Sequence, residues 1–421
     1  MAEDILQQRQ TRILLASEKQ RRAANPDKSV WVEASAGTGK TKVLSDRVLR
    51  LLLKGVNPAK ILCLTYTKAA AVEMNARIAG RLSRWAVASG EVLQKELSAL
   101  LGRPLAENRT DTDLQATARK LFAILLDTPG GMKIQTIHSF CQEVLKRFPL
   151  EAKISPYFEV MDDRSANEAI AEVKVRLLQK IEQEPDSLAG RNLAYITQNV
   201  SEFVFPRIME NITANRSKIA RLLARYSSLE DLLEQTAKQL GLALSDTRQS
   251  LIKAFWAQFD KDDLREVMNA LFASSATDKQ RAEILAGILE QGLTEENLSA
   301  FQNIYLTGGK MRSRLATQGA VSAYPEILEK MSATAMEVQK LNNRLAAVGL
   351  LAATKAVLYL AEDLIGGYNA YKRLHSKMDY EDLIVLTRRL LEDKSVADWV
   401  LYKLDGGIDN VLIDEAQDTS P

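Results

Sequence analysis

The sequence predicts an α/β domain, a parallel sheet with helices on both faces, that is interrupted by a large all-α insertion. Three observations support this prediction. Apolar runs that are typical of buried strands occur at Lys60–Tyr66 and Asn410–Asp414. A segment with helical periodicity lies before the first of these runs. The stretch from about Asp162 to Ala356 is rich in helix-forming residues and contains three prolines.

Alternating strands and helices are predicted at the start of the chain. The run SVWVEA, Ser29–Ala34, lies between NPDK and a group of glycines, which favours a strand. The segment TKVLSDRVLRLLLKG has apolar side chains at helical spacing and ends at Gly55. Lys60–Tyr66 shows no polar alternation, as expected of a strand that is buried on both faces. This order predicts a right-handed crossover and parallel pairing.

The middle of the chain favours helices, and the end returns to the sheet. SANEAIAEVKVRLLQKI and SLEDLLEQTAKQLGLAL are both amphipathic, and we expect Ser165 and Ser228 to cap them. VADWVLYKLDGG predicts a helix that ends at glycine, and NVLID predicts another buried strand. The expected domains are residues 1–164 and 356–421 for the two α/β segments and 165–355 for the insertion.

Composition limits the function classes. The chain has 421 residues, 46% of them hydrophobic, which is enough for two or three domains. A net charge of +2 neither requires nor excludes nucleic acid. Two cysteines cannot form a disulfide framework or a four-thiolate metal site. The polar start is not a signal peptide, and no window approaches the roughly 18 uninterrupted apolar residues of a membrane span. We therefore expect a cytoplasmic protein with no membrane partner.

The stretch VEASAGTGKT fits the phosphate-binding pattern G-x-x-x-x-G-K-[ST], with Ala34 in place of the first glycine. Small residues let backbone N–H groups point at an anion, and the start of the following helix adds its dipole. Lys40 would contact the β- and γ-phosphates, and Thr41 would ligate Mg²⁺. The alternative is a chance glycine-rich turn. The candidate nucleotide-binding residues here are Ala34, Ser35, Ala36, Gly37, Thr38, Gly39, Lys40 and Thr41.

The second candidate for the same site is VLIDEAQD near residue 414. An apolar strand that ends in adjacent acids suits a Mg-ATP site: Asp414 would hold the metal and Glu415 would activate the attacking water. A solvated strand end is the alternative, but the upstream phosphate-binding pattern favours catalysis. ATP and Mg²⁺ are therefore the predicted cofactors.

The segments ASAGTGKT, LTYTKAAAVEM, IQTIHSFC and LIDEAQD, in this order, resemble the UvrD/Rep-like superfamily 1 DNA helicases. IQTIHSFCQEVLKRFPLEA and VLIDEAQDTSP look most similar to the AddA-type subunits of AddAB helicase–nucleases, which act in bacterial double-strand break repair. The resemblance covers Glu18–Met161 and Met378–Pro421 and is weak in the insertion. It implies a RecA-like P-loop domain with a 1B-like helical insertion.

The resemblance also implies roles for single residues. Gln20 occupies the position of a glutamine that contacts adenine, and Gln417 that of a γ-phosphate sensor. The family's DNA-contacting motifs match Thr65, Tyr66 and Thr67, and then Thr136, His138 and Ser139. Alternatives remain for Gln20 as an ordinary helix residue, Tyr66 as a buried strand residue, His138 as a structural histidine and Gln417 as a solvated loop residue. Lys42 stands where the family often has arginine, which leaves a nucleotide contact there in doubt.

Other charged residues favour structural roles. The segment MDYEDLI resembles a family segment that re-enters the motor domain, and we expect its acids to cap and pack a helix. We expect His375 to be structural. A solvated helix face is favoured over phosphate contact for most of the basic residues of the insertion, such as Arg216, Lys218 and Arg221.

The function implied by the resemblance is ATP-driven translocation on single-stranded DNA, with unwinding and resection of duplex DNA ends. The implied partner is an AddB-type subunit. Such motors close ATP between two RecA-like domains, and these residues contain neither the second domain nor a nuclease domain. We therefore expect an N-terminal part that hydrolyses ATP poorly alone. The alternatives are another UvrD- or RecB-like helicase, a P-loop ATPase of a different class, and an inactive P-loop scaffold that does not act on DNA.

Overall fold

The computed structural model describes residues 16–33, 39–405 and 407–416. The chain is mostly helical, with a small parallel sheet, and it divides into two compact units. The first unit consists of Met1–Asp163 and Ser376–Pro421, and the second is Arg164–His375. The chain therefore leaves the first unit once and returns to it once.

The first unit carries all three strands of the parallel sheet. Residues 16–23 form a helical segment at its start. The labelled elements follow in this order: α2 Lys40–Leu53, η1 Pro58–Lys60, β1 Ile61–Thr65, α3 Lys68–Val87, α4 Gly90–Leu101, α5 Arg109–Asp127, β2 Lys133–Thr136, α6 Ile137–Arg147, β3 Glu159–Val160, β6 Lys377–Met378, α18 Tyr380–Glu392, α19 Ala397–Asp405 and β7 Asn410–Ile413.

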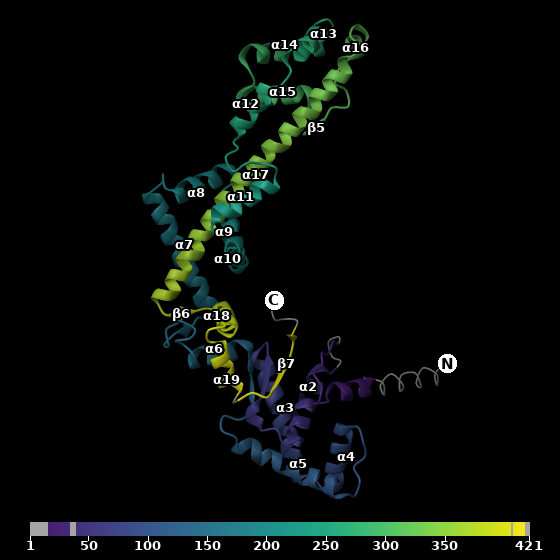
Figure 1. Cartoon of the computed structure of the whole chain (residues 1–421), viewed down its shortest axis with the longest axis vertical. Coiled ribbons are helices and arrows are strands. Elements are labelled where there is room, and N and C mark those ends of the chain that lie inside the picture. Colours follow the sequence, from purple (N-terminus) through teal and green to yellow (C-terminus); the bar gives the residue numbers. More distant parts are fainter. Residues whose placement is uncertain (1–15, 34–38, 406, 417–421) are drawn as a thin grey trace, which may run out of the picture. The chain divides into compact units, whose positions relative to one another are not determined.

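The sheet has the strand order β2-β1-β7, and both pairs are parallel. The strands predicted at Lys60–Tyr66 and Asn410–Asp414 are confirmed, as is their parallel pairing. Thr65 lies opposite Thr136, and Leu64 lies opposite Ile413. Figure 1 shows the yellow β7 from the end of the chain among elements from its first 150 residues. The carboxyl ends of three strands therefore meet at one edge of the sheet.

Helices bury β1 from both sides. All five residues of β1 are buried. Ile61 and Cys63 share a core with side chains of α2, α3, α4 and α5. Leu62 and Leu64, which alternate with them along the strand, are also buried, so both faces of β1 are covered. The predicted helix after the phosphate-binding pattern is confirmed: α2 ends before Gly55, which adopts a φ of 84°.

The predicted strand Ser29–Ala34 is wrong for the residues that the structure describes. Residues 29–33 form no strand, and Val30, Trp31 and Val32 are exposed, Trp31 by 78%. A strand needs a neighbour with which to exchange backbone hydrogen bonds. In the described residues β1 pairs with β2 on one side and β7 on the other, and residues 29–33 pair with none of them. Ala34 lies outside the described residues.

A second, short pair of strands joins the two segments of the first unit. β3 pairs in parallel with β6, with Glu159 opposite Lys377 and Val160 opposite Met378. After β6, Asp379 caps α18 in a capping box with Asp382, so the expectation that the acids of MDYEDLI cap a helix is confirmed. The points where the chain leaves and re-enters this unit therefore lie side by side.

The second unit is almost entirely helical. Its elements are α7 Asp163–Gln183, α8 Leu188–Asn199, α9 Phe205–Ala214, α10 Arg216–Leu223, α11 Leu229–Gln239, α12 Arg248–Gln258, α13 Lys261–Phe272, α14 Ala276–Gln291, α15 Glu295–Tyr305, β4 Leu306–Thr307, β5 Lys310–Met311, α16 Gln318–Ala323 and α17 Ile327–Leu374. The two strands form an antiparallel hairpin. In Figure 1 α17 is the long light-green helix along which the teal helices of this unit are arranged.

The helix α17 has 48 residues and is the central element of this unit. It contacts α8, α10, α11, α12, α13 and α15. Its buried residues recur every three or four positions, which places one stripe against these helices. Among the described helices it alone has the length and composition to cross a membrane, a weak indication, since core helices also meet this criterion. The buried stripe is what a core helix requires.

Two expectations about this unit can be compared with the structure. The cap at Ser228 is confirmed, because its side chain accepts a hydrogen bond from the Asp231 N–H. The cap at Ser165 is wrong, because α7 begins at Asp163, an acid that the positive end of a helix dipole favours. The unit continues past residue 355 to His375 because α17 extends through that position without a break.

Candidate active site

Gly39 and Lys40 form the start of α2. Gly39 is the N-cap residue with a φ of 91°, a conformation that favours glycine over residues with a Cβ. Lys40 and Thr41 are the first two residues of the helix, so their backbone N–H groups belong to its unpaired first turn. This local geometry suits an anion. The predicted residues Ala34, Ser35, Ala36, Gly37 and Thr38 lie outside the described residues.

Gln20 lies next to this helix start. It belongs to the helical segment 16–23, and a Cβ built on Gly39 would lie 3.1 Å from the Gln20 Nε2. The side-chain amide is therefore in van der Waals range of the last glycine of the phosphate-binding pattern. The structure thus brings together two residues that the sequence analysis singled out separately.

Asp414 and Glu415 follow β7 and lie near Lys40. The Asp414 N–H donates to the Leu64 carbonyl over 2.8 Å, and one Asp414 carboxylate oxygen accepts from the Glu415 N–H over 3.1 Å. The Lys40 Nζ lies 3.6 Å from a Glu415 carboxylate oxygen. Two motifs that are more than 370 residues apart in the chain therefore meet in space. Gln417 lies outside the described residues.

The electrostatic environment of Asp414 suits a bound cation. Burial raises the pKa of Asp414, and the charges of Glu415 and Glu73 add to this, while the Glu415 N–H and Lys40 act against it. A carboxylate that is costly to ionise alone is stabilised by a divalent ion. In the described part of the chain no group of three or more His, Cys, Asp or Glu residues could hold a metal. Mg²⁺ fits this sparse site, because it commonly takes one or two protein ligands, with waters and phosphates completing its shell.

The carboxyl end of β1 presents an aromatic side chain. Tyr66 is 49% exposed, so the alternative of a buried strand residue does not describe it. Thr65 is fully buried, and its hydroxyl donates to the Thr67 carbonyl over 3.0 Å. Thr67 is exposed and caps α3 by accepting a hydrogen bond from the Ala70 N–H. Thr65 thus shapes the turn that places Tyr66 and Thr67 at the surface.

The carboxyl end of β2 is built in the same way. Thr136 caps α6 by accepting from the Ser139 N–H, and the two hydroxyls are 2.8 Å apart. The His138 ring lies 4.9 Å from the Tyr380 ring, between centroids. Burial lowers the pKa of His138, while Asp163 opposes this shift, so the structure gives His138 a packed, largely neutral setting. The two predicted DNA-contacting loops are neighbours because Thr65 and Thr136 are in register.

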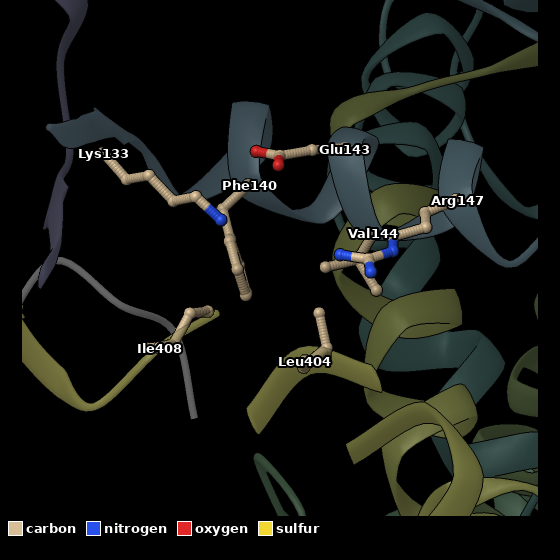
Figure 2. A pocket seen from close by; sticks show the side chains of 7 residues that line it. All are labelled: Lys133, Phe140, Glu143, Val144, Arg147, Leu404 and Ile408. Atoms are coloured by element: carbon tan, nitrogen blue, oxygen red, sulfur yellow. The ribbon is translucent and has the colours of Figure 1, made fainter. Parts of the chain in front are cut away.

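The hollow in Figure 2 is a different place. It lies at the amino end of β2, where Lys133 begins the strand, and α6 contributes Phe140, Glu143 and Arg147 to it. Its cavity volume is about 10 Å³, which is room for about one water molecule. A nucleotide does not fit there, and none of the predicted site residues lines it. Ligands of parallel sheets bind at the carboxyl ends of strands, where the candidate site lies.

Comparison with known proteins bears on what this arrangement is. Residues 15–421 match the model of the UvrD/REP helicase N-terminal domain. The chain belongs to this family. The match includes the helical second unit as well as the sheet, so family membership does not rest on the short motifs alone.

Curated relatives of this UvrD/REP family chain are named as the AddA component of an ATP-dependent helicase/nuclease. The protein of Lactobacillus johnsonii is 25% identical over 435 residues, which is 93% of this chain and 32% of the relative. That of Lactiplantibacillus plantarum is 22% identical over 94% of this chain and 32% of the relative. That of Lactobacillus acidophilus is 32% identical over 170 residues, which is 40% of this chain and 12% of the relative. The chain spans about a third of the length of the first and second of these.

Three charged residues near the site of this UvrD/REP family chain were not predicted from its sequence. Glu73 contributes to the raised pKa of Asp414, and Arg47 and Arg50 bind the backbone near Gln20. The helical pattern of residues 41–55 placed the two arginines on α2 but could not show what they contact. Knowing that position 50 is buried would have been the useful signal, since a buried arginine needs partners.

Proposed function

We propose that this chain is the ATP-binding motor part of an AddA-type DNA helicase that translocates on single-stranded DNA. The observation that carries the proposal is the meeting of Lys40, Asp414 and Glu415 at the same sheet edge as the exposed Tyr66. An ATP site and a candidate base-stacking residue next to each other are what a motor on single strands requires. The names of the relatives support this choice among superfamily 1 helicases.

The proposed fold is a RecA-like domain with a helical insertion. The parallel order β2-β1-β7, with helices covering both faces of β1, supports the RecA-like assignment of the first unit. The second unit, Arg164–His375, takes the place of the proposed 1B-like insertion, expected at 165–355. The family match supports both assignments.

In the proposed ATP site, the backbone of Gly39, Lys40 and Thr41 and the Lys40 side chain bind phosphate oxygens. Thr41 and Asp414 hold Mg²⁺, which supplies charge neutralisation at the transferring phosphoryl group. Glu415 orients the attacking water. The Lys40–Glu415 ion pair is partly exposed, so it contributes little and a triphosphate can compete for Lys40. Gln20 contacts adenine, and Gln417 and residues 34–38 keep their predicted roles.

In the proposed DNA site, Tyr66 stacks on a base. Thr67, His138 and Ser139 contact the strand from the two neighbouring loops, while Thr65 and Thr136 act mainly through the turns that they stabilise. Stacking does not depend on base identity, which suits translocation along any sequence. Single-stranded DNA and duplex ends are the proposed substrates, in double-strand break repair. The proposed partner is an AddB-type subunit, and the proposed compartment is the cytoplasm.

ATP hydrolysis by the complete gene product, together with its AddB-type partner, tests the proposal. We expect single-stranded DNA to stimulate turnover strongly, and the stimulated turnover to disappear in Lys40→Ala. A Lys42→Ala variant is the matched control, because Lys42 is exposed two residues further along the same helix. Turnover that does not respond to DNA would refute the helicase assignment and favour another class of P-loop ATPase.

A further inference from the structure

Two arginines on α2, Arg47 and Arg50, bind main-chain carbonyls rather than acids in most of their contacts. The Arg47 Nη1 donates to the Asn25 carbonyl over 2.7 Å and to the Ala23 carbonyl over 3.3 Å, and its Nη2 donates to the Lys28 carbonyl. The Arg50 Nη1 donates to the Arg21 carbonyl over 3.0 Å. Both side chains therefore hold the end of the helical segment 16–23 and the turn after it.

These contacts complete the hydrogen bonding of that helix end. The last carbonyls of a helix have no partner within it. The Ala24 and Asn25 N–H groups donate to the carbonyls of Gln20 and Arg22. The two carbonyls that alternate with these, of Arg21 and Ala23, accept from the arginines instead.

Arg50 also ties the segment to α4. Its Nε donates to the Leu100 carbonyl over 3.1 Å, and its Nη2 donates to the same oxygen. At the end of α4, a Cβ on Gly102 would lie 2.8 Å from the Arg21 Cδ, so the absence of a side chain lets the segment approach this closely. Arg50 is only 9% exposed, and burial lowers the pKa of its guanidinium. Such a buried charge is costly, which makes a bystander role a poor explanation.

The geometry connects these arginines to the nucleotide site. They lie two and three turns after Lys40 on the same helix, and the segment that they hold carries Gln20, whose amide lies against Gly39. The distance from Gln20 to the helix start therefore depends on Arg47 and Arg50, in addition to the chain between them.

We propose that Arg47 and Arg50 are positioning residues that hold Gln20 at a fixed place relative to Lys40, and so set how well the site distinguishes adenine from other bases. This inference rests on the proposed adenine contact of Gln20. Neither arginine needs to touch the nucleotide, because each acts through the carbonyl groups of the Gln20 segment.

Equilibrium binding of three ligands tests the inference: ATP, GTP and inorganic tripolyphosphate, each with Mg²⁺, to the complete gene product. We expect Gln20→Ala and Arg47→Met each to reduce the preference for ATP over GTP by about tenfold, the size of one to two hydrogen bonds. Tripolyphosphate, which has no base, should bind with unchanged affinity. Arg84→Met is the matched control, because Arg84 is exposed on α3. Arg47→Lys keeps the charge but loses the forked donor geometry, and should also lose preference.

The double variant Gln20→Ala/Arg47→Met should lose no more preference than Gln20→Ala alone, because both changes remove the same contact. If Arg47→Met keeps the wild-type preference while Gln20→Ala loses it, the positioning role is refuted and the adenine contact stands. If Gln20→Ala keeps the preference, the adenine contact itself is refuted, and the inference with it. An equal loss of ATP, GTP and tripolyphosphate affinity in Arg47→Met would show a general structural role and refute base positioning.

Discussion

Glu415 has a backbone φ of 52°, in the left-handed region that residues with a side chain rarely adopt. The neighbouring Asp414 is buried and accepts the Glu415 N–H, so the turn aims the two carboxylates in different directions. One acid is buried and suited to a metal ion, and the other is partly exposed beside Lys40. Strain of this kind persists where the surrounding structure imposes it, often at functional sites.

The division of roles between these acids predicts the effect of Glu415→Gln. We expect ATP turnover to fall by roughly 10²- to 10⁴-fold, the range for loss of a general base. ATP affinity should stay the same or rise, because Lys40 loses its carboxylate partner. Steady-state hydrolysis and equilibrium ATP binding of the complete gene product measure the two effects. A parallel loss of affinity would show that Glu415 is needed to bind nucleotide rather than to hydrolyse it.

The raised pKa of Asp414 predicts a pH-dependent stability. Between the ordinary value of 3.8 and the raised value, the folded protein binds more protons than the unfolded chain. Stability therefore falls as the pH rises through this window, and the penalty remains in full above it. We expect Asp414→Asn to have a higher melting temperature than wild type at pH 7 in the absence of Mg²⁺. The difference should vanish as the pH approaches 3.8, and a variant that melts lower at pH 7 would contradict the assigned penalty.

The exposure of Tyr66 predicts a defect that is specific to DNA. Tyr66→Ala should weaken binding to single-stranded DNA by about 1–3 kcal/mol, the range for one stacked base. Tyr157→Ala is the control, since this tyrosine is 86% exposed on the loop before β3 and belongs to no predicted motif. Fluorescence anisotropy with a labelled oligonucleotide measures both. Equal losses in the two variants would argue against a stacking site at the end of β1.

At the scale of elements, the parallel register explains why loops from distant parts of the chain converge. β1 and β2 come from the first 140 residues and β7 from the last 15, yet all three point their carboxyl ends the same way. Each loop is then fixed by a helix cap just beyond the strand: Thr67 for α3 and Thr136 for α6. Strand direction gives the approximate position of each loop, and the cap fixes its conformation.

A cap in the first unit offers a test of element stability. Asp379→Ala removes the side chain that accepts the Asp382 N–H, so we expect a loss of about 1 kcal/mol in the free energy of unfolding. Asp398→Ala on α19 is the control, because Asp398 is exposed and forms no cap; its change should stay within about 0.5 kcal/mol. Urea titration followed by circular dichroism compares them. Equal changes would mean that the capping box contributes no more than an ordinary surface acid.

The sequence predicted elements where apolar spacing alone decides the outcome. The five residues of β1 are apolar except for Thr65, and α2 combines helical spacing with a terminal Gly55, so both were predicted correctly. The failure at Ser29–Ala34 has a different cause: β-branched and aromatic residues indicate strand preference but do not supply a neighbouring strand. The contacts of Arg47 and Arg50 were also beyond sequence reasoning, because they depend on which backbone carbonyls lie nearby.

At the scale of the whole molecule, the pairing of β3 with β6 means that the second unit joins the first at one place. Neighbouring strands lie about 4.8 Å apart, so a short linker can bridge the gap between Asp163 and Ser376. The cores of the two units are built from separate sets of residues.

This arrangement predicts that residues 164–375 can be replaced by a short Gly/Ser linker without loss of the first unit's fold. We expect the shortened protein to unfold cooperatively and to bind Mg-ATP with affinity close to that of the intact chain, since the ATP-site residues are all in the first unit. Thermal unfolding and ATP binding measure this. An aggregated product with no unfolding transition would show that the first unit depends on the second.

The placement of β7 also affects how the protein is made. About 340 residues separate the end of β1 from the start of β7, and at ribosomal rates of 5–20 residues per second this corresponds to a delay of roughly 20 to 70 s. During that time one edge of β1, with the apolar sequence ILCLT, has no partner strand. Such an edge is a template for aggregation. The nascent chain should therefore need protection by a chaperone until β7 emerges and closes the sheet.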